Sequence, residues 1–162
     1  MQEIRTGLGW DSHRFVAGRP LILGGVDLGH DLGLDGHSDA DVLTHAVMDA
    51  LLGAAGLDDI GAHFPDTDER WRGADSIALL GEVGALLAAA GFTVVNVDAT
   101  ICMERPKVGA RRTEMRTRLA GALGLDPGRV NVKATTGERM GFVGREEGVA
   151  AMAVATLASG VA

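Results

Sequence analysis

The chain has 162 residues, of which 46% are hydrophobic and 23% charged, a size and composition that favour a single domain over residues 1–162. Its net charge of −7 argues against non-specific binding to nucleic acid or an anionic membrane, and the N-terminal MQEIRTGLGW lacks the apolar run of a secretion signal. The single cysteine, Cys102, excludes an intrachain disulfide and suits a reducing compartment, so we expect a cytoplasmic protein.

The first half of the chain shows strand and helix signals separated by loops. Periodicity and turn residues predict, in order, a strand at 4–11, a strand at 20–26, a loop at 27–37, a helix at 38–55 that Gly56 ends, and a long loop at 58–73. Loops of this last length in compact domains are usually functional or disordered.

The second half continues the alternation. It predicts a helix from Asp75 to Gly91, a strand at 93–103 with Val95, Val97, Ala99 and Ile101 on one face, a helix opened by Pro106 that reaches Leu123, and a strand at 129–135. Residues 148–158 are rich in Ala and Val, and periodicity does not decide between strand and helix.

A short internal echo links two of these strands. Residues 96–100 and 131–135 share the pattern N-V-x-A-T, and each begins a strand that follows a helix. The echo is either a coincidence or the mark of two related β-α halves in one mixed sheet.

Polar residues on the first strand and the first helix suggest a metal site. Asp11 and His13 project to one face of the strand because they are two residues apart, and Gly7 and Gly9 keep that face open. On the helix, Asp41, His45 and Asp49 form a polar stripe among apolar neighbours, and Asp49 is placed to orient His45. The structural alternatives are that Asp11 and His13 form a surface polar pair and that His45 is an ordinary core histidine.

If Asp11, His13 and His45 converge, they offer one oxygen and two imidazoles. This donor set suits zinc, and three protein ligands leave a coordination position open, as in catalytic sites.

Two further segments have the chemistry of phosphate sites. Ser38 is a candidate N-cap with Asp41 three residues on, so His37 and Ser38 would lie at a helix N-terminus, where backbone N–H groups attract anions. The segment after the last predicted strand, with Thr136, Glu138 and Arg145, offers hydroxyls, an arginine and an oxygen ligand for Mg²⁺. A plain cap and a glycine-rich turn are the structural alternatives.

Two shorter segments allow both a binding and a structural interpretation. The acidic loop at 59–68 can hydrogen-bond a polyol or form local turns. The basic segment at 105–107 can meet a nucleotide's phosphate or begin a helix.

Over residues 1–145 the chain resembles the 2-C-methyl-D-erythritol 2,4-cyclodiphosphate synthase family. The resemblance is carried by G-W-D-S-H at 9–13, the long segment at 32–68, E-R-P-K at 104–107 and N-V-K-A-T-T-G-E-R-M-G-F-V-G-R-E-E-G at 131–148. It implies that the 2-phosphate of 4-diphosphocytidyl-2-C-methyl-D-erythritol 2-phosphate attacks the β-phosphate, that CMP leaves, and that a cyclic diphosphate forms.

The resemblance also implies roles for individual residues. Zn²⁺, one per subunit, would be held by Asp11, His13 and His45, and a second ion, Mg²⁺ or Mn²⁺, by Glu138. His37 and Thr136 would stabilise the transition state. The substrate would contact Asp11, His13, His37, Ser38, Asp59, Ile60, Gly61, Phe64, Pro65, Asp66, Thr67, Asp68, Met103, Glu104, Arg105, Pro106, Lys107, Ala134, Thr135, Thr136, Gly137, Glu138, Phe142 and Arg145.

For the fold, the resemblance implies an α/β (α+β) structure with a single mixed β-sheet, helices packed on one face and two related β-α halves. It implies a homotrimer with the sheets around the three-fold axis and active sites between subunits, and 24 glycines with only 4% aromatics fit a small-residue core shared between subunits. Phe142, Arg145 and Glu147 match residues near a central cavity that takes isoprenoid diphosphates.

The sequence departs from the family pattern at three positions. Trp10 stands where the family usually has Phe or Tyr, Leu8 replaces a common His or Tyr, and Gly137 stands where a hydroxyl or amide residue is frequent.

Two rival functions stay open: a metal-dependent phosphohydrolase that activates water, and a non-catalytic trimer that binds isoprenoid diphosphates.

Overall fold

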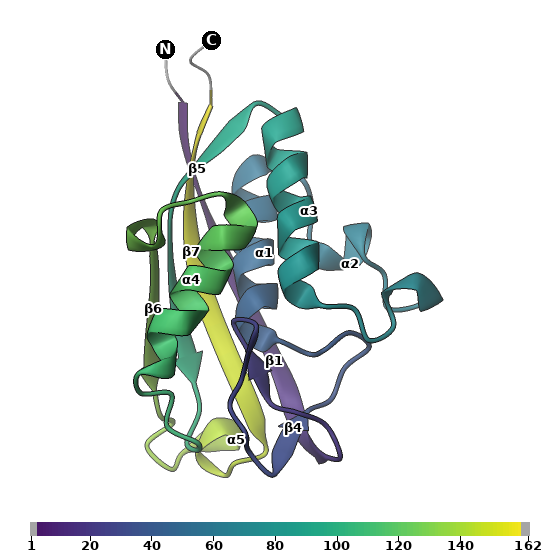
Figure 1. The fold of residues 1–162 in the computed structure, drawn as a ribbon, viewed down its shortest axis with the longest axis vertical. Coiled ribbons are helices and arrows are strands. Elements are labelled where there is room, and N and C mark those ends of the chain that lie inside the picture. Colours follow the sequence, from purple (N-terminus) through teal and green to yellow (C-terminus); the bar gives the residue numbers. More distant parts are fainter. Residues whose placement is uncertain (1–2, 160–162) are drawn as a thin grey trace.

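The computed structural model describes residues 3–159 as one mixed β-sheet covered by helices on one face (Figure 1). The strand order is β4-β1-β7-β5-β6, in which only β5 and β6 run parallel. The sheet strands are β1 Glu3–Ala17, β4 Leu32–Leu34, β5 Phe92–Cys102, β6 Val130–Thr135 and β7 Gly148–Ser159, and a separate hairpin pairs β2 Ile22–Leu23 with β3 Val26–Asp27. The predicted mixed sheet is confirmed.

Three long helices lie on the same face of the sheet (Figure 1). They are α1 Val42–Ala55, α3 Ser76–Ala89 and α4 Arg111–Leu123, and the short elements are α2 Ile60–His63, α5 Gly141–Gly144 and the 3₁₀ turns η1 Glu69–Trp71 and η2 Pro127–Arg129. Helix α1 packs on β1 and β7 and is covered in turn by α3. One continuous core of buried side chains joins the helices to the sheet. None of the described helices has the length and apolar character needed to cross a membrane.

Helix α1 begins four residues later than the sequence predicts. Its N-cap is Asp41, not Ser38, and the buried Asp41 carboxylate accepts hydrogen bonds from the N–H groups of Thr44, Gly24 and Gly25 at 3.0, 2.9 and 2.7 Å. Burial raises the pKa of this carboxyl. Asp41 therefore joins the start of α1 to the turn of the β2–β3 hairpin.

Two glycines let β1 lie directly against α1. A Cβ at Gly7 would come 2.0 Å from the carbonyl oxygen of Ala50, and a Cβ at Gly9 would come 1.9 Å from that of Ala46. The expectation that these glycines keep the strand face open is therefore wrong, because the helix backbone fills the space. The close contact fixes how far His45 on the helix lies from Asp11 and His13 on the strand.

Two details of the second half differ from the sequence prediction. A register irregularity between Val94 and Asn96 in the pairing of β5 with β7 moves Val94 into the core and leaves Val95 exposed, whereas Val97, Ala99 and Ile101 are buried as expected. Pro106 lies in a loop before α4 rather than at its start.

Residues 148–158, for which periodicity does not decide between strand and helix, lie in the strand β7. This strand pairs with β1 on one side and with β5 on the other, and it carries the apolar run expected of a central strand. The echoing strands β5 and β6 are parallel neighbours, but Asp98, not Asn96, lies opposite Asn131.

The face of the sheet away from the helices presents apolar side chains to solvent in the single chain. Leu8 is 71% exposed and Trp10 55%, with Met152 and Val154 both at 41%. These four residues lie on the paired central strands β1 and β7.

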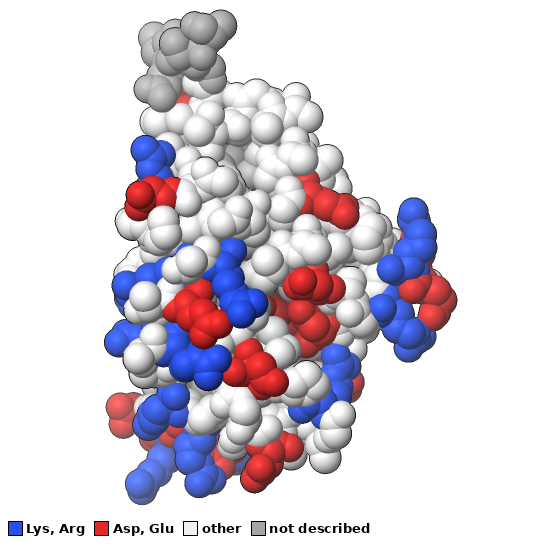
Figure 2. Space-filling model, viewed as in Figure 1, with Lys and Arg blue, Asp and Glu red and all other residues white. Residues whose placement is uncertain are grey.

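On the face drawn in Figure 2, Lys and Arg gather over α4 and the end of the sheet beside it, although the net charge is negative.

Candidate metal site and adjoining cavity

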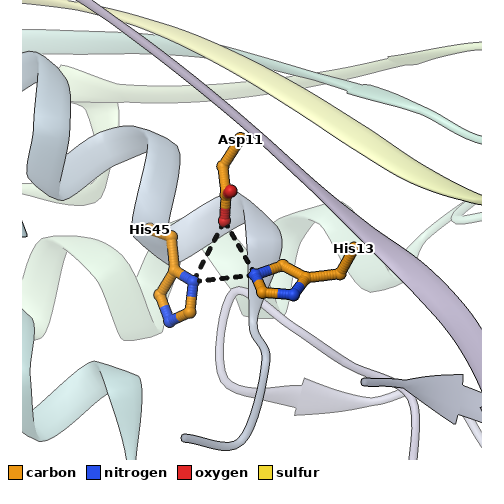
Figure 3. Close-up of side chains that lie close together, drawn as sticks. All are labelled: Asp11, His13 and His45. Carbon is orange, nitrogen blue, oxygen red and sulfur yellow. Dashed lines mark hydrogen bonds and ion pairs between the residues drawn. The ribbon is translucent and has the colours of Figure 1, made fainter. Parts of the chain in front are cut away.

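The three predicted metal ligands come together where β1 passes α1 (Figure 3). The Oδ2 of Asp11 lies 2.9 Å from the Nε2 of His13 and 3.0 Å from the Nδ1 of His45, and the two ring nitrogens are 3.2 Å apart. His45 is buried, while the other two side chains are partly exposed. One carboxylate oxygen and two imidazole nitrogens therefore face a common point.

Each histidine is held by its other ring nitrogen. The Nδ1–H of His13 donates to the carbonyl oxygen of Asp35 at 2.6 Å. The Nε2 of His45 lies 2.9 Å from the Oγ of Ser76 and 3.1 Å from that of Ser38. With these outer nitrogens protonated, the inner ones present lone pairs toward Asp11, as metal ligands require.

Ser76 is itself fixed by an acid. Its Oγ donates to the Oδ1 of Asp39 at 2.5 Å, and its backbone N–H donates to the Oδ2 at 3.0 Å. Since the hydroxyl proton points to Asp39, the lone pairs of the oxygen are left for the Nε2–H of His45.

Asp49 does not orient the imidazole of His45, because its carboxylate accepts the N–H of Ile60 at 2.9 Å instead. The expectation that Asp49 orients His45 is wrong.

The electrostatics of the cluster favour an ionised acid beside a histidine that binds a proton readily. Burial alone would raise the pKa of Asp11, but hydrogen bonds from His13 and His45 outweigh it and lower that pKa to about 2. Burial opposes protonation of His13, yet the hydrogen bond and charge of Asp11 raise its pKa above the usual value. A cation that binds here competes with a proton for His13.

The donor set fits a divalent metal ion. The ligand atoms of Asp11, His13 and His45 all lie within 4.8 Å of one another, so an ion can lie between them at ordinary bond lengths after small side-chain movements. Three protein ligands leave one tetrahedral position for an oxygen from outside the chain.

A cavity of about 400 Å³ opens beside the three ligands. Its wall combines a polar side at the metal ligands with an apolar side at the loop that follows α1. It is lined by Asp11, His13, Gly36, His37, Ser38, His45, Met48, Ile60, Gly61, Phe64, Pro65, Asp66, Trp71 and Leu79.

The acids at the two ends of the 59–68 loop serve local structure. Asp59 caps α2 by accepting the N–H of Ala62 at 3.0 Å, and Asp68 caps η1 and pairs with Arg70 at 2.6 Å. The hydrogen bond from Arg70 lowers the pKa of Asp68. Asp66 lines the cavity, whereas Asp59, Thr67 and Asp68 are absent from the lining that the described residues form.

The other predicted site residues gather at a different place, beyond the ends of β5 and β6. The N–H of Met103 donates to the carbonyl of Thr135 at 2.9 Å, and the Oε1 of Glu104 accepts the N–H of Gly137 at 2.7 Å. Thr136 accepts the N–H of Glu138 at 3.1 Å. The group comprises Met103, Glu104, Arg105, Pro106, Lys107, Ala134, Thr135, Thr136, Gly137 and Glu138.

This second group is not part of the metal cluster within one chain. In the sheet, β7 lies between β1 and β5, so β6 is three strand spacings, roughly 14 Å, from β1. Arg105 forms a bidentate ion pair with Glu146 at 2.6 and 2.7 Å, and Arg145 pairs with Glu147 at 2.9 Å. Phe142 is 38% exposed near the start of β7.

The departure at Gly137 has a steric explanation. A Cβ there would come 2.8 Å from the N of Gly144 and 2.9 Å from the carbonyl oxygen of Met140, so the turn closes too tightly for a side chain. The other two departures, Leu8 and Trp10, lie on the exposed face of the sheet, away from the metal cluster.

Several residues of the site were not predicted from the sequence. Ser76 and Asp39 position His45, Trp71 packs edge-on against Phe64 with ring centroids 5.1 Å apart, and Arg19 donates to the loop that carries His37. None belongs to a spaced motif of metal ligands or phosphate donors. Only their positions in the folded chain bring them to the site.

Comparison with known sequences agrees with this geometry. The sequence model of the YgbB family matches residues 4–158. The bifunctional enzyme IspD/IspF of Anaeromyxobacter dehalogenans is 62% identical over 154 residues, which cover 95% of this chain and 40% of the relative. The 2-C-methyl-D-erythritol 2,4-cyclodiphosphate synthase of Symbiobacterium thermophilum is 60% identical, with coverage of 94% of this chain and 97% of the relative. The chain therefore spans about two fifths of the bifunctional relatives and nearly all of the single-function one.

Solved structures of similar proteins have the same fold. The bifunctional IspDF of Campylobacter jejuni superposes with a TM-score of 0.95 at 43% identity, covering 99% of this chain and 43% of that one. A 2C-methyl-D-erythritol-2,4-cyclodiphosphate synthase in a CDP-bound form superposes with a TM-score of 0.86 at 39% identity, covering 94% of this chain and 99% of that one.

Proposed function

Because the chain belongs to the YgbB family, we propose that it converts 4-diphosphocytidyl-2-C-methyl-D-erythritol 2-phosphate to 2-C-methyl-D-erythritol 2,4-cyclodiphosphate and CMP. A 2-phosphate oxygen forms a bond to the β-phosphorus, and the bond from that phosphorus to the oxygen bridging to CMP breaks. The observation that carries the proposal is the convergence of Asp11, His13 and His45 beside a cavity large enough for a phosphorylated polyol.

The nucleophile of this reaction is already part of the substrate, so the chain needs to position two phosphates rather than supply a reacting group. Asp11, His13 and His45 would hold a Zn²⁺ ion. Glu138 would contribute an oxygen to a second divalent ion, Mg²⁺ or Mn²⁺. When bound, these cations neutralise phosphate charge and polarise the phosphoryl oxygens.

The chain's own residues orient the rest of the substrate. His37 and Ser38, which line the cavity, would bind the 2-phosphate. The methylerythritol would contact the loop residues that line the cavity, Ile60, Gly61, Phe64, Pro65 and Asp66. His37 and Thr136 hydrogen-bond the charge that develops during transfer. Phe64, Trp71 and Leu79 exclude water from the cavity, which favours ring closure over hydrolysis.

We further propose that the active site is completed by a second subunit of a homotrimer. The group beyond β5 and β6, which includes Met103 to Lys107 and residues 134–138, binds the cytidine diphosphate portion next to a neighbour's metal cluster. Two observations support this: the separation of roughly 14 Å between β1 and β6 within one chain, and the exposed apolar face of the sheet. Phe142 and Arg145 would lie near a central cavity that accepts an isoprenoid diphosphate.

The test is CMP release from the proposed substrate, with the second product identified by phosphorus NMR. We compare the native protein, chelated protein, His45→Ala, and His30→Ala as a control outside the cavity lining. We expect cyclic diphosphate from the native protein and His30→Ala, and a loss of at least a hundredfold in the other two. Turnover that survives both chelation and His45→Ala would defeat the metal mechanism. A linear diphosphate product would instead favour the phosphohydrolase.

A further inference from the structure

Arg19, which lies between β1 and β2, contacts the loop that carries His37 and Ser38. Its Nη1 donates to the carbonyl oxygen of Gly36 at 2.6 Å, and its Nη2 donates to that of Ser38 at 2.5 Å. The side chain is 30% exposed, and its nearest acid, Asp35, lies 4.0 Å away. Most of the hydrogen bonding of this guanidinium is therefore directed to the backbone of one short turn.

The remaining carbonyls of the turn are held as well. The carbonyl of Asp35 accepts the Nδ1–H of His13 at 2.6 Å, and that of His37 accepts the N–H of Gly73 at 2.8 Å. Four consecutive carbonyls, from Asp35 to Ser38, are thus each fixed by a donor from another segment of the chain.

Holding the carbonyls also directs the N–H groups. In a planar trans peptide the N–H points away from the C=O of the preceding residue. The bond from Arg19 to the carbonyl of Gly36 therefore sets the direction of the N–H of His37, and the bond from Gly73 sets that of Ser38. Within residues 3–159, the N–H groups of Gly36, His37 and Ser38 find no hydrogen-bond acceptor, and all three residues line the cavity.

These N–H groups, rather than the helix terminus, are the backbone donors available to an anion in the cavity. Helix α1 begins at Val42, and the carboxylate of Asp41 already occupies its N-terminus. Consecutive backbone N–H groups in a turn form an anion site without a helix.

We propose that Arg19 is a positioning residue, which holds the turn at residues 36–38 in the conformation that binds the 2-phosphate of the substrate. The inference rests on the proposed function. A guanidinium suits the task because its fork reaches two carbonyls at once, whereas a lysine ammonium on a flexible stem holds one firmly.

The experiment compares Arg19→Met, Arg19→Lys and the control Arg118→Met, whose arginine pairs with Glu114 on the exposed side of α4. We expect Arg19→Met to lower kcat/KM for CMP release by about a hundredfold, as a misplaced binding group does. Arg19→Lys should recover about tenfold of this loss. Zinc affinity should stay within threefold of native in all three, because Ser76, which lies outside this turn, still holds the Nε2 of His45.

Activity within threefold of native in Arg19→Met would overturn the inference. So would a loss matched by an equal loss of zinc affinity and thermal stability, which would indicate a general structural role. If Arg19→Met does not fold, Arg19→Lys against native carries the comparison, with an expected tenfold deficit.

A separate measurement distinguishes this inference from the proposed function. Inorganic phosphate is titrated into the zinc-loaded native and Arg19→Lys proteins while the amide NMR signals of Gly36, His37 and Ser38 are followed. We expect these signals to shift in the native protein and to require about tenfold more phosphate in the variant. Equal titration of the two proteins would overturn the role of Arg19, whereas absent turnover by the native protein with a normal titration would overturn only the proposed reaction.

Discussion

At the scale of single residues, the candidate site depends on which nitrogen of each imidazole carries a proton. The Nε2 of His45 is paired with the hydroxyls of Ser38 and Ser76, and the hydroxyl of Ser76 is turned by Asp39. When a metal ion is bound, this chain of contacts would keep the proton of His45 on Nε2, so that the lone pair of Nδ1, which lies 3.0 Å from the Oδ2 of Asp11, would face the ion. Groups of this kind set the affinity of a metal site although they do not touch the metal.

We therefore expect Ser76→Ala to weaken zinc binding by about 10- to 100-fold, the usual effect of removing such a partner. Ser12→Ala is the matched control, since the residue is adjacent to Asp11 but alternates to the other side of β1. Zinc affinity is measured by competition with a chromophoric chelator. An unchanged affinity in Ser76→Ala would mean that Ser38 alone orients the imidazole.

Zinc affinity should also rise with pH. Asp11 raises the pKa of His13, so a proton competes with the metal for His13 at and below this pKa and ceases to compete above it. Competition titrations of the native protein at pH 6, 7 and 8 should show steadily tighter binding. The same affinity at all three values would contradict the raised pKa.

The sequence predicted this site unevenly, and the reason differs from residue to residue. Asp11, His13 and His45 are found from side-chain periodicity because each lies on a regular element. Ser76 is 31 positions from His45 and has no spacing rule to connect the two. Asp49 fits the helical stripe, yet its carboxylate is used by the N–H of Ile60, a contact that periodicity does not reveal.

At the scale of elements, the distance between β1 and α1 decides whether the ligands meet. Gly7 and Gly9 allow the strand backbone to approach the carbonyls of Ala50 and Ala46. Strand and helix positions were mostly predictable, because hydrophobic periodicity marks them. The β5 irregularity, the later start of α1 and the strand at 148–159 were not, since each depends on contacts with other segments.

Gly9→Ala should destabilise the fold by about 1–3 kcal/mol and lower zinc affinity, because the helix has to move away from the strand. Gly53→Ala is the control on α1 itself, where a Cβ meets nothing within 4 Å. Alanine there should leave zinc binding unchanged and stabilise the fold by about 0.5–1 kcal/mol. Urea unfolding and chelator competition measure both effects. Equal behaviour of the two variants would contradict the importance of the close approach.

At the scale of the whole molecule, one chain keeps the two groups of candidate site residues apart and leaves apolar side chains of its sheet exposed. The residues beyond β5 and β6 are separated from the metal cluster by the width of the sheet, and the apolar side chains of Leu8, Trp10, Met152 and Val154 face solvent. Association with further copies of the chain would bring the two groups of site residues together and cover the exposed apolar side chains. Composition alone gave only a weak indication of this, because the exposed face becomes visible only after the strands are assigned.

If the proposed trimer forms through this face, Leu8→Asp should dissociate it and abolish CMP release while zinc binding is retained. The introduced carboxylate would have to be buried without a partner in the interface, whereas the metal ligands lie on the opposite face of β1. Thr117→Asp on the exposed side of α4 is the control. Analytical ultracentrifugation gives the assembly state. An active assembly of normal size in Leu8→Asp would rule out this face as the contact.

The pairing of Glu3 with Ser159 has a practical consequence for anyone who wishes to attach something to this protein. The start of β1 and the end of β7 lie at one pole of the molecule (Figure 1), and the eight residue-to-residue steps of β1 from Glu3 to Asp11 span roughly 26 Å. A tether, dye or second polypeptide joined near either residue would leave from the same pole, far from the cation ligands. Anchoring the protein to a surface through this pole would leave the cation ligands away from that surface.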